Sequence, residues 1–144
     1  MNNNLYFDTS AWLRMFLTGR PGHQTARRMW HEADEVSSVL VTYTETLAAL
    51  ALTHRQGHLP PRPHARLKSA WDMVWPDLKI VDIDQDLVMH AGRLAERHAL
   101  RGYDAVQLAA ARRSGCGVFV SADKALNAAA QRLRLRVVDL NSHS

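Results

Sequence analysis

Short apolar runs alternate with longer segments of helical periodicity along this chain, and this alternation restricts the fold more than any other feature. Runs of strand length occupy residues 4–7, 36–41, 78–83, 118–120 and 136–140. Helical spacing of large side chains occupies residues 11–17, 23–33, 43–55, 65–74, 85–99, 104–113 and 123–133. Strands that alternate with helices predict an α/β fold, a three-layer α/β/α sandwich with a mostly parallel central sheet.

Three local motifs predict where individual helices begin. Ser10 stands at the start of the first expected helix and is a preferred N-cap residue. Thr42 precedes the third expected helix and Glu45 follows three positions later, which is the capping-box arrangement. The proline-rich stretch at residues 60–63 breaks the regular pattern and leads into the fourth. In this interpretation, the Glu45 carboxylate is engaged by its own helix.

The length and composition favour a single domain. A chain of 144 residues with 47% hydrophobic content suits one domain over residues 1–144 with one continuous core. No stretch approaches the roughly 20 apolar residues that span a bilayer, and the first residues lack the basic and apolar regions of a secretory signal. We therefore expect a cytoplasmic protein without a membrane segment.

The charge balance favours an anionic partner, although only weakly. The chain has 18 lysine and arginine residues against 14 acidic residues, for a formal net charge of +4. Scattered arginines more often mark a solvated surface than a binding face, so the charge agrees with nucleic acid as a partner without establishing it.

Four acidic residues fall at one edge of the expected sheet. Asp8 ends the first strand, Glu45 lies in the first helical turn after the second, and Asp123 follows the strand at residues 118–120. Asp104 follows no expected strand, but its position at a helix start can aim it the same way. Right-handed crossovers place the loops after parallel strands along one edge, which is where ligands bind in such folds.

Each of these acids, taken alone, has a structural explanation. Asp104 and Asp123 can cap helices, Asp8 can form a turn, and Glu45 can complete its capping box. Capping does not explain why four acids gather at one end of the sheet, where like charges repel. A cation removes this conflict, and oxygen ligands without cysteine or paired histidine favour Mg²⁺ or Mn²⁺. Water activated by such a metal can hydrolyse a phosphodiester.

Four motifs in this order resemble those of a known family. They are Leu5-Tyr6-Phe7-Asp8-Thr9-Ser10-Ala11, Thr44-Glu45, the segment from Leu100 to Ala111 around Gly102-Tyr103-Asp104, and Val120-Ser121-Ala122-Asp123-Lys124-Ala125-Leu126. Over nearly the whole chain, the sequence resembles the PIN domain, and within it the toxins of VapBC-type toxin–antitoxin pairs. The segment around Asp104 is the most specific of the four.

This resemblance implies an activity and a set of partners. It implies that Asp8, Glu45, Asp104 and Asp123 hold Mg²⁺ or Mn²⁺ and that RNA, such as transfer RNA, is cleaved to 3′-hydroxyl and 5′-phosphate ends. It also implies a homodimer and a cognate antitoxin that blocks the site. The family pattern further places two small hydroxyl residues near the metal, and two arginines close to the acids are candidates for RNA contact: Ser10, Ser121, Arg14 and Arg101.

Two other functions stay open from the sequence. A phosphoryl-transfer protein also places acids at strand ends, but a dehalogenase-type phosphatase would want an acid at Ser10, and a receiver domain would want an acidic pair before its phosphorylated Asp. A non-catalytic RNA-binding module on the same fold would bind RNA without metal.

Overall fold

The computed structural model describes residues 3–142, and its centre is a sheet of five parallel strands in the order β3-β2-β1-β4-β5. The strands are β1 (Asn4–Phe7), β2 (Glu35–Val39), β3 (Lys79–Val81), β4 (Val118–Ser121) and β5 (Val137–Asp139). The fold prediction is confirmed, and within the described residues the sheet is entirely parallel. The single-domain expectation also included residues 1, 2, 143 and 144, which lie outside the described residues.

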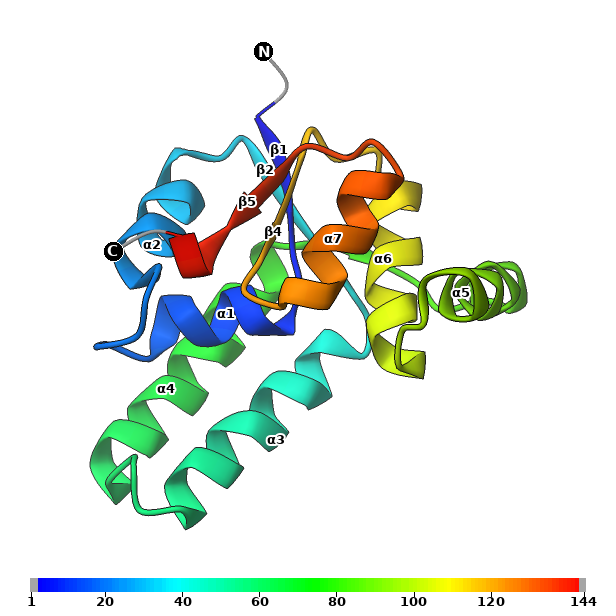
Figure 1. Ribbon diagram of the computed structural model, residues 1–144. Helices are drawn as coiled ribbons and strands as arrows, with labels where there is room; N and C mark the ends of the chain where they lie inside the picture. The colour runs from blue at the N-terminus through cyan, green and yellow to red at the C-terminus, as the bar shows by residue number, and fades with distance from the viewer. Residues whose placement is uncertain (1–2, 143–144) are drawn as a thin grey trace.

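Helices follow the strands in the expected order (Figure 1). They are α1 (Thr9–Phe16), α2 (His23–Glu32), α3 (Thr42–Arg55), α4 (Pro61–Val74), α5 (Gln85–His98), α6 (Gly102–Ser114) and α7 (Lys124–Arg132), with short 3₁₀ helices η1 (Trp75–Asp77) and η2 (Leu140–Ser142). Helix α4 begins four residues earlier than predicted, because proline fits the first helical positions, where no backbone N–H is needed. No helix in the described part of the chain has the length and apolar character to cross a membrane.

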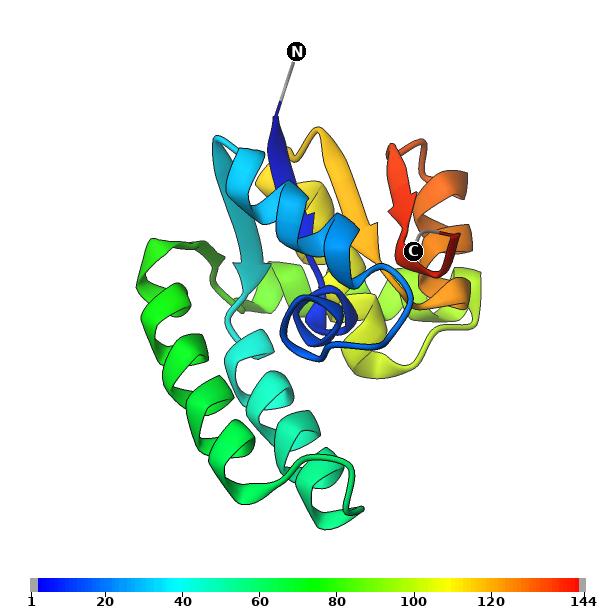
Figure 2. The same cartoon turned by 90° about the vertical axis from the view of Figure 1, so that its left-hand side faces the viewer.

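The strands bury a separate apolar core on each face of the sheet. Tyr6 and Phe119 point to one face and pack with residues of α5, α6 and α7. Leu5 and Phe7 point to the opposite face, where Trp12 and other residues of α1, α2 and α4 cover them. Alternation of side chains along a strand explains this division, and helices on both faces produce the three-layer sandwich (Figure 2).

Helices α3 and α4 lie side by side and project beyond the sheet (Figures 1 and 2). Leu50 and Leu59 form a small third cluster there with Leu17 from the end of α1. The start of α3 stays beside the sheet edge because it closely follows β2. Glu45 lies near this start and contacts Thr9 and Gln107, whereas the far end of the hairpin projects away.

Both capping assignments were wrong. Asp8, not Ser10, caps α1, and its Oδ1 accepts a hydrogen bond of 2.9 Å from the Ala11 amide. Helix α3 is capped by Val41 without a side-chain hydrogen bond, so no capping box forms. Thr42 is already inside the helix and buried, and Glu45 points to partners on other elements.

Candidate active site

Asp8 lies at the end of β1 and is almost completely buried, with 3% of its surface exposed. Its Oδ1 accepts hydrogen bonds from the Ser10 hydroxyl at 2.7 Å and the Ala11 amide at 2.9 Å. Its Oδ2 accepts one from the Ser121 hydroxyl at 2.6 Å. These three donors fix the carboxylate, and Oδ2 retains a lone pair for a further partner.

The buried Asp8 carboxyl holds its proton more tightly than an exposed one. Burial raises its pKa from 3.8 to about 6, and the negative charge of Asp123 adds to this effect. Hydrogen bonds from Ser121, Ser10 and Ala11 oppose the rise. Desolvation therefore outweighs the donors, and the ionised form is costly until a cation compensates it.

Ser10 and Ser121 join the ends of β1 and β4 around Asp8. Their hydroxyl oxygens lie 3.2 Å apart. The Ala122 amide donates to Ser10 at 2.8 Å, and the Asp123 amide donates to Ser121 at 2.9 Å. The two serines thus bind the Asp8 carboxylate and also hold the loop that carries Asp123.

Asp104 and Asp123 both lie at helix starts. Asp123 is the N-cap of α7 and accepts a hydrogen bond of 3.0 Å from the Leu126 amide. Asp104 lies in the first turn of α6 and is half-buried. Burial raises the pKa of Asp104, and the charges of Asp123 and Glu45 raise it further, while Arg101 lowers it. The four predicted acids therefore share one electrostatic field.

Gln107 holds the fourth acid in place, and our sequence analysis did not identify it. This residue of α6 is 2% exposed, and its Nε2 lies 2.8 Å from Glu45 Oε1, 3.0 Å from the Thr42 hydroxyl and 3.2 Å from the Thr9 hydroxyl. Tyr6 donates a hydrogen bond of 2.6 Å to its Oε1, which sets the orientation of the amide. The sequence feature that could have identified Gln107 is its position three residues after Asp104, in an otherwise apolar stretch of helix.

Glu45 also accepts a hydrogen bond of 2.7 Å from the Thr9 hydroxyl. Thr9 directly follows Asp8, so the network links Glu45 to the end of β1. Hydrogen bonds thus connect Asp8, through the adjacent residue, with α3 and α6.

The donor set fits a hydrated divalent cation. The two ion pairs within residues 3–142 are Lys79–Glu35 and Arg113–Asp84, so none of the four acids is neutralised by a basic side chain there. No three Asp, Glu, His or Cys side chains of that range converge closely enough to hold one ion as they stand. Mg²⁺ keeps several waters and commonly binds through one or two carboxylates, so such a cage is not required.

The two candidate arginines differ in their surroundings. Arg14 is partly buried in α1, and it donates to the Pro21 carbonyl at 2.7 Å and to Asn141 Oδ1 at 3.0 Å. Burial lowers its pKa and the nearby Arg20 lowers it further, while the charges of Asp139 and, to a smaller extent, Asp8 oppose this. Arg101 is exposed at the N-cap of α6, from where its charge acts on Asp104.

Comparison with known proteins gives three informative matches. Ribonuclease VapC45 of Mycobacterium tuberculosis is 37% identical over 107 residues, which are 74% of each chain. The crystal structure of Mycobacterium tuberculosis VapC20, described as a sarcin-ricin loop cleaving toxin, is 25% identical with a TM-score of 0.67, covering 87% of this chain and 94% of that one. A toxin–antitoxin complex from Klebsiella pneumoniae shares the fold with a TM-score of 0.61 at 20% identity, covering 83% and 86%.

A protein-family model agrees with these matches. The PIN domain model matches residues 5–132, a range that contains all four acids and Gln107. The sheet order, the sequence relatives and this match are consistent with one another, and the chain therefore belongs to the PIN domain family.

Proposed function

We propose that this protein is an endoribonuclease that requires Mg²⁺ or Mn²⁺ and leaves 3′-hydroxyl and 5′-phosphate ends. The main support is the Asp8 carboxylate, which is buried and close enough to Asp123 for the two negative charges to repel. No ion pair within the described residues neutralises either acid. An isolated buried carboxylate costs several kcal/mol, so its retention favours a cationic ligand. The relative named as a ribonuclease supports RNA as the substrate.

Each acid has a distinct part in this proposal. Asp8 would bind the cation, and Ser10 and Ser121 keep its carboxylate oriented by hydrogen bonds. Asp104, Asp123 and Glu45 would supply further negative charge to hold the cation. When bound, the metal supplies Lewis-acid activation of water and of the phosphoryl group.

Gln107 and Thr9 are positioning residues in this scheme. Both donate to Glu45 Oε1, so the carboxylate cannot rotate freely. The Tyr6 hydroxyl keeps the Gln107 amide turned with its nitrogen toward Glu45. Second-layer contacts of this kind commonly alter metal affinity or activity by about 10- to 100-fold.

Its biological role in the proposal is that of a toxin held inactive by a cognate antitoxin. The names of VapC20 and of the Klebsiella pneumoniae complex support this assignment. The proposal extends to a homodimer and to structured RNA, including transfer RNA, as the substrate. The proposal also assigns RNA-backbone contact to Arg14, whose pKa is affected by the charge of Asp8, and to Arg101, whose charge acts on Asp104.

The activity is tested with purified protein and 5′-labelled transfer RNA. Cleavage is expected with Mg²⁺ or Mn²⁺ and not in EDTA. Asp8→Asn and Asp104→Asn should each lose at least about 100-fold in rate, whereas the exposed Asp82→Asn should retain full activity. Product fragments should accept a new 5′ label only after phosphatase treatment. Equal activity in all variants refutes the proposal, and RNA binding without cleavage favours a non-catalytic module.

The toxin role is tested in cells. Expression of the wild-type chain should arrest bacterial growth, and Asp8→Asn should not. Co-expression of the protein encoded by a short reading frame beside the gene should restore growth and block cleavage in vitro. Arrest that persists equally in the Asp8→Asn variant contradicts this role.

A further inference from the structure

A basic groove lies between α5 and α6, outside the candidate active site. Two adjoining hollows of about 480 and 290 Å³ share their lining. Together they define the α5–α6 groove, which is lined by His90, Arg93, Leu94, Arg97, Arg112, Arg113 and Leu133. Arginines from two helices converge here, and no acidic side chain is part of the lining.

The positive charge of the groove is largely uncompensated. Arg113 pairs with Asp84 at 2.8 Å, which is the one ion pair of these arginines within the described residues. Arg112 donates to the His90 ring at 3.3 Å, which leaves its charge unneutralised. Burial lowers the pKa of His90, and Arg112, Arg93 and Arg113 lower it further, so the cationic fields overlap at this point.

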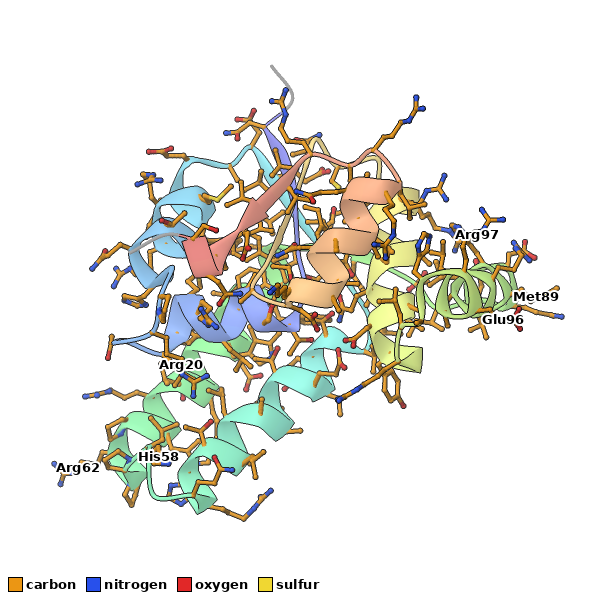
Figure 3. All side chains as sticks on the ribbon, viewed as in Figure 1. Arg20, His58, Arg62, Met89, Glu96 and Arg97 are labelled. Atoms are coloured by element: carbon orange, nitrogen blue, oxygen red, sulfur yellow. The ribbon has the colours of Figure 1, made fainter. Side chains whose placement is uncertain are left out.

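Glu96, an acidic residue of α5, is not part of the groove lining. Figure 3 shows Glu96 and Arg97 extending from opposite sides of this helix. Arg93 and Arg97 are exposed, and no ion pair within residues 3–142 involves either of them. The two guanidinium groups are therefore free to meet an anionic ligand.

Helix α6 connects the groove to the candidate active site. Asp104 lies in its first turn and Arg112 in its last. Eight residues at 1.5 Å each separate the two by about 12 Å along the helix axis. An extended polyanion held at the acids can therefore reach the groove.

We propose that the α5–α6 groove binds the phosphate backbone of the RNA strand that continues beyond the cleaved bond. This inference rests on the proposed ribonuclease function and adds to it a second contact region for the substrate. The contact is with backbone rather than bases, because planar guanidinium groups match phosphate oxygens in pairs. This second contact region makes the protein bind long RNA more tightly than short fragments.

The lining favours RNA over an acidic protein segment. Protein interfaces depend on apolar and aromatic anchors in their buried centres. The groove lining contains no Phe, Tyr or Trp, and of its two leucines Leu94 is buried in the core beneath α5. Nucleic-acid interfaces are more polar and more positively charged, as this groove is.

The binding test uses a 30-nucleotide fluorescein-labelled single-stranded RNA in EDTA, where cleavage does not interfere. Arg93→Gln/Arg97→Gln is compared with Arg62→Gln/Arg66→Gln, which removes the same charge from exposed positions on α4, at the opposite side of the molecule (Figure 3). We expect the groove variant to bind about three- to tenfold more weakly. The slope of log K against log salt should be shallower by about 1.4, as loss of two phosphate contacts to a single strand predicts.

The control variant should bind the RNA like wild type, and both variants should keep the wild-type melting temperature. If both variants lose RNA affinity equally, the loss reflects net charge alone and the proposal is refuted. Loss of poly-glutamate binding with unchanged RNA binding also overturns it, because the groove would then serve an acidic protein.

Cleavage separates this inference from the proposed function. With the long RNA and Mg²⁺, the groove variant should raise KM and leave kcat unchanged, since it loses uniform binding. With a four-nucleotide substrate, its kcat/KM should equal that of wild type. If the KM for long RNA is unchanged in the groove variant, the proposed RNA contact at the groove is refuted, and the proposed ribonuclease activity is not affected. If the wild-type protein does not cleave RNA, the proposed ribonuclease function is refuted. The binding measurement in EDTA then decides by itself whether the groove binds RNA.

Discussion

The side-chain amide of Gln107 donates a hydrogen bond of 2.8 Å to Glu45, across 62 residues of sequence. The opposite end of the same amide accepts a hydrogen bond from the buried Tyr6 hydroxyl. A glutamine amide is asymmetric, and its two ends cannot exchange without breaking both contacts. One buried phenol thus determines how a candidate catalytic carboxylate is held on another helix.

Replacing Gln107 should therefore reduce activity without unfolding the protein. Gln107→Leu removes the donor to Glu45, and we expect kcat to fall by about 10- to 100-fold. Tyr6→Phe keeps the amide but frees it to turn, so a smaller loss is expected. The discriminating measurement is the Mg²⁺ concentration for half-maximal activity, which should rise in both variants. A loss of stability with unchanged Mg²⁺ dependence would show that Gln107 is only structural.

Asp8 should make the metal-free protein less stable as the pH rises. Its folded pKa of about 6 lies above the unfolded value of 3.8, so the folded state binds the proton more tightly. The contribution of Asp8 to stability in EDTA should be greatest below pH 4, fall between pH 4 and 6, and level off above. The difference of about two pKa units corresponds to about 3 kcal/mol.

Asp8→Asn tests this pH dependence directly, because it keeps the side-chain shape without the charge. Denaturant unfolding in EDTA should show the variant to be more stable than wild type at pH 7 and similar to it at pH 4. The variant should still lose some stability as the pH rises, but less than wild type does, because the pKa of Asp104 is also raised. Superimposable pH profiles for the two proteins would contradict the assignment.

Divalent cations should stabilise the folded wild-type protein. A ligand present at 100 times its Kd adds about 2.7 kcal/mol when it binds only the folded state. We therefore expect Mn²⁺ to raise the melting temperature of wild type and of Asp82→Asn, and to leave Asp8→Asn almost unchanged. An equal rise in all three proteins would place the binding elsewhere.

Gly22 should tolerate alanine far less than Gly57 does. Both have left-handed backbone angles, with φ of 84° and 80°. A Cβ at Gly22 would collide with the backbone and side chain of Leu140, whereas a Cβ at Gly57 meets open space. We expect Gly57→Ala to cost about 1 kcal/mol and Gly22→Ala at least about 3 kcal/mol in urea unfolding. Similar values would mean that the C-terminal turn moves aside freely.

Hydrophobic periodicity predicted the order of strands and helices because it is a local property. Strand β1 and helix α5 begin where their patterns predicted, since burial of one face requires regular spacing. Helix α4 was predicted too short, because the residues at its start are two prolines, an arginine and a histidine, which carry no periodic apolar pattern.

The capping motifs failed because they considered only neighbours in sequence. The Thr42 hydroxyl accepts a hydrogen bond from Gln107 instead of capping its helix. Glu45, the expected partner in the capping box, contacts Thr9 and Gln107 instead. Packing of α6 against the sheet brings these distant donors within reach, and no short motif contains that information.

The sequence alone was enough to predict a mostly parallel α/β architecture and the sheet edge at which Asp8 and Asp123 lie, because the alternation of strands and helices is a local pattern and crossovers between parallel strands are right-handed. The tertiary structure decided which donors hold each carboxylate, how deeply Asp8 is buried, and that arginines of α5 and α6 line one groove. Those outcomes depend on contacts between residues far apart in the chain, whose energies are settled only when the layers pack together.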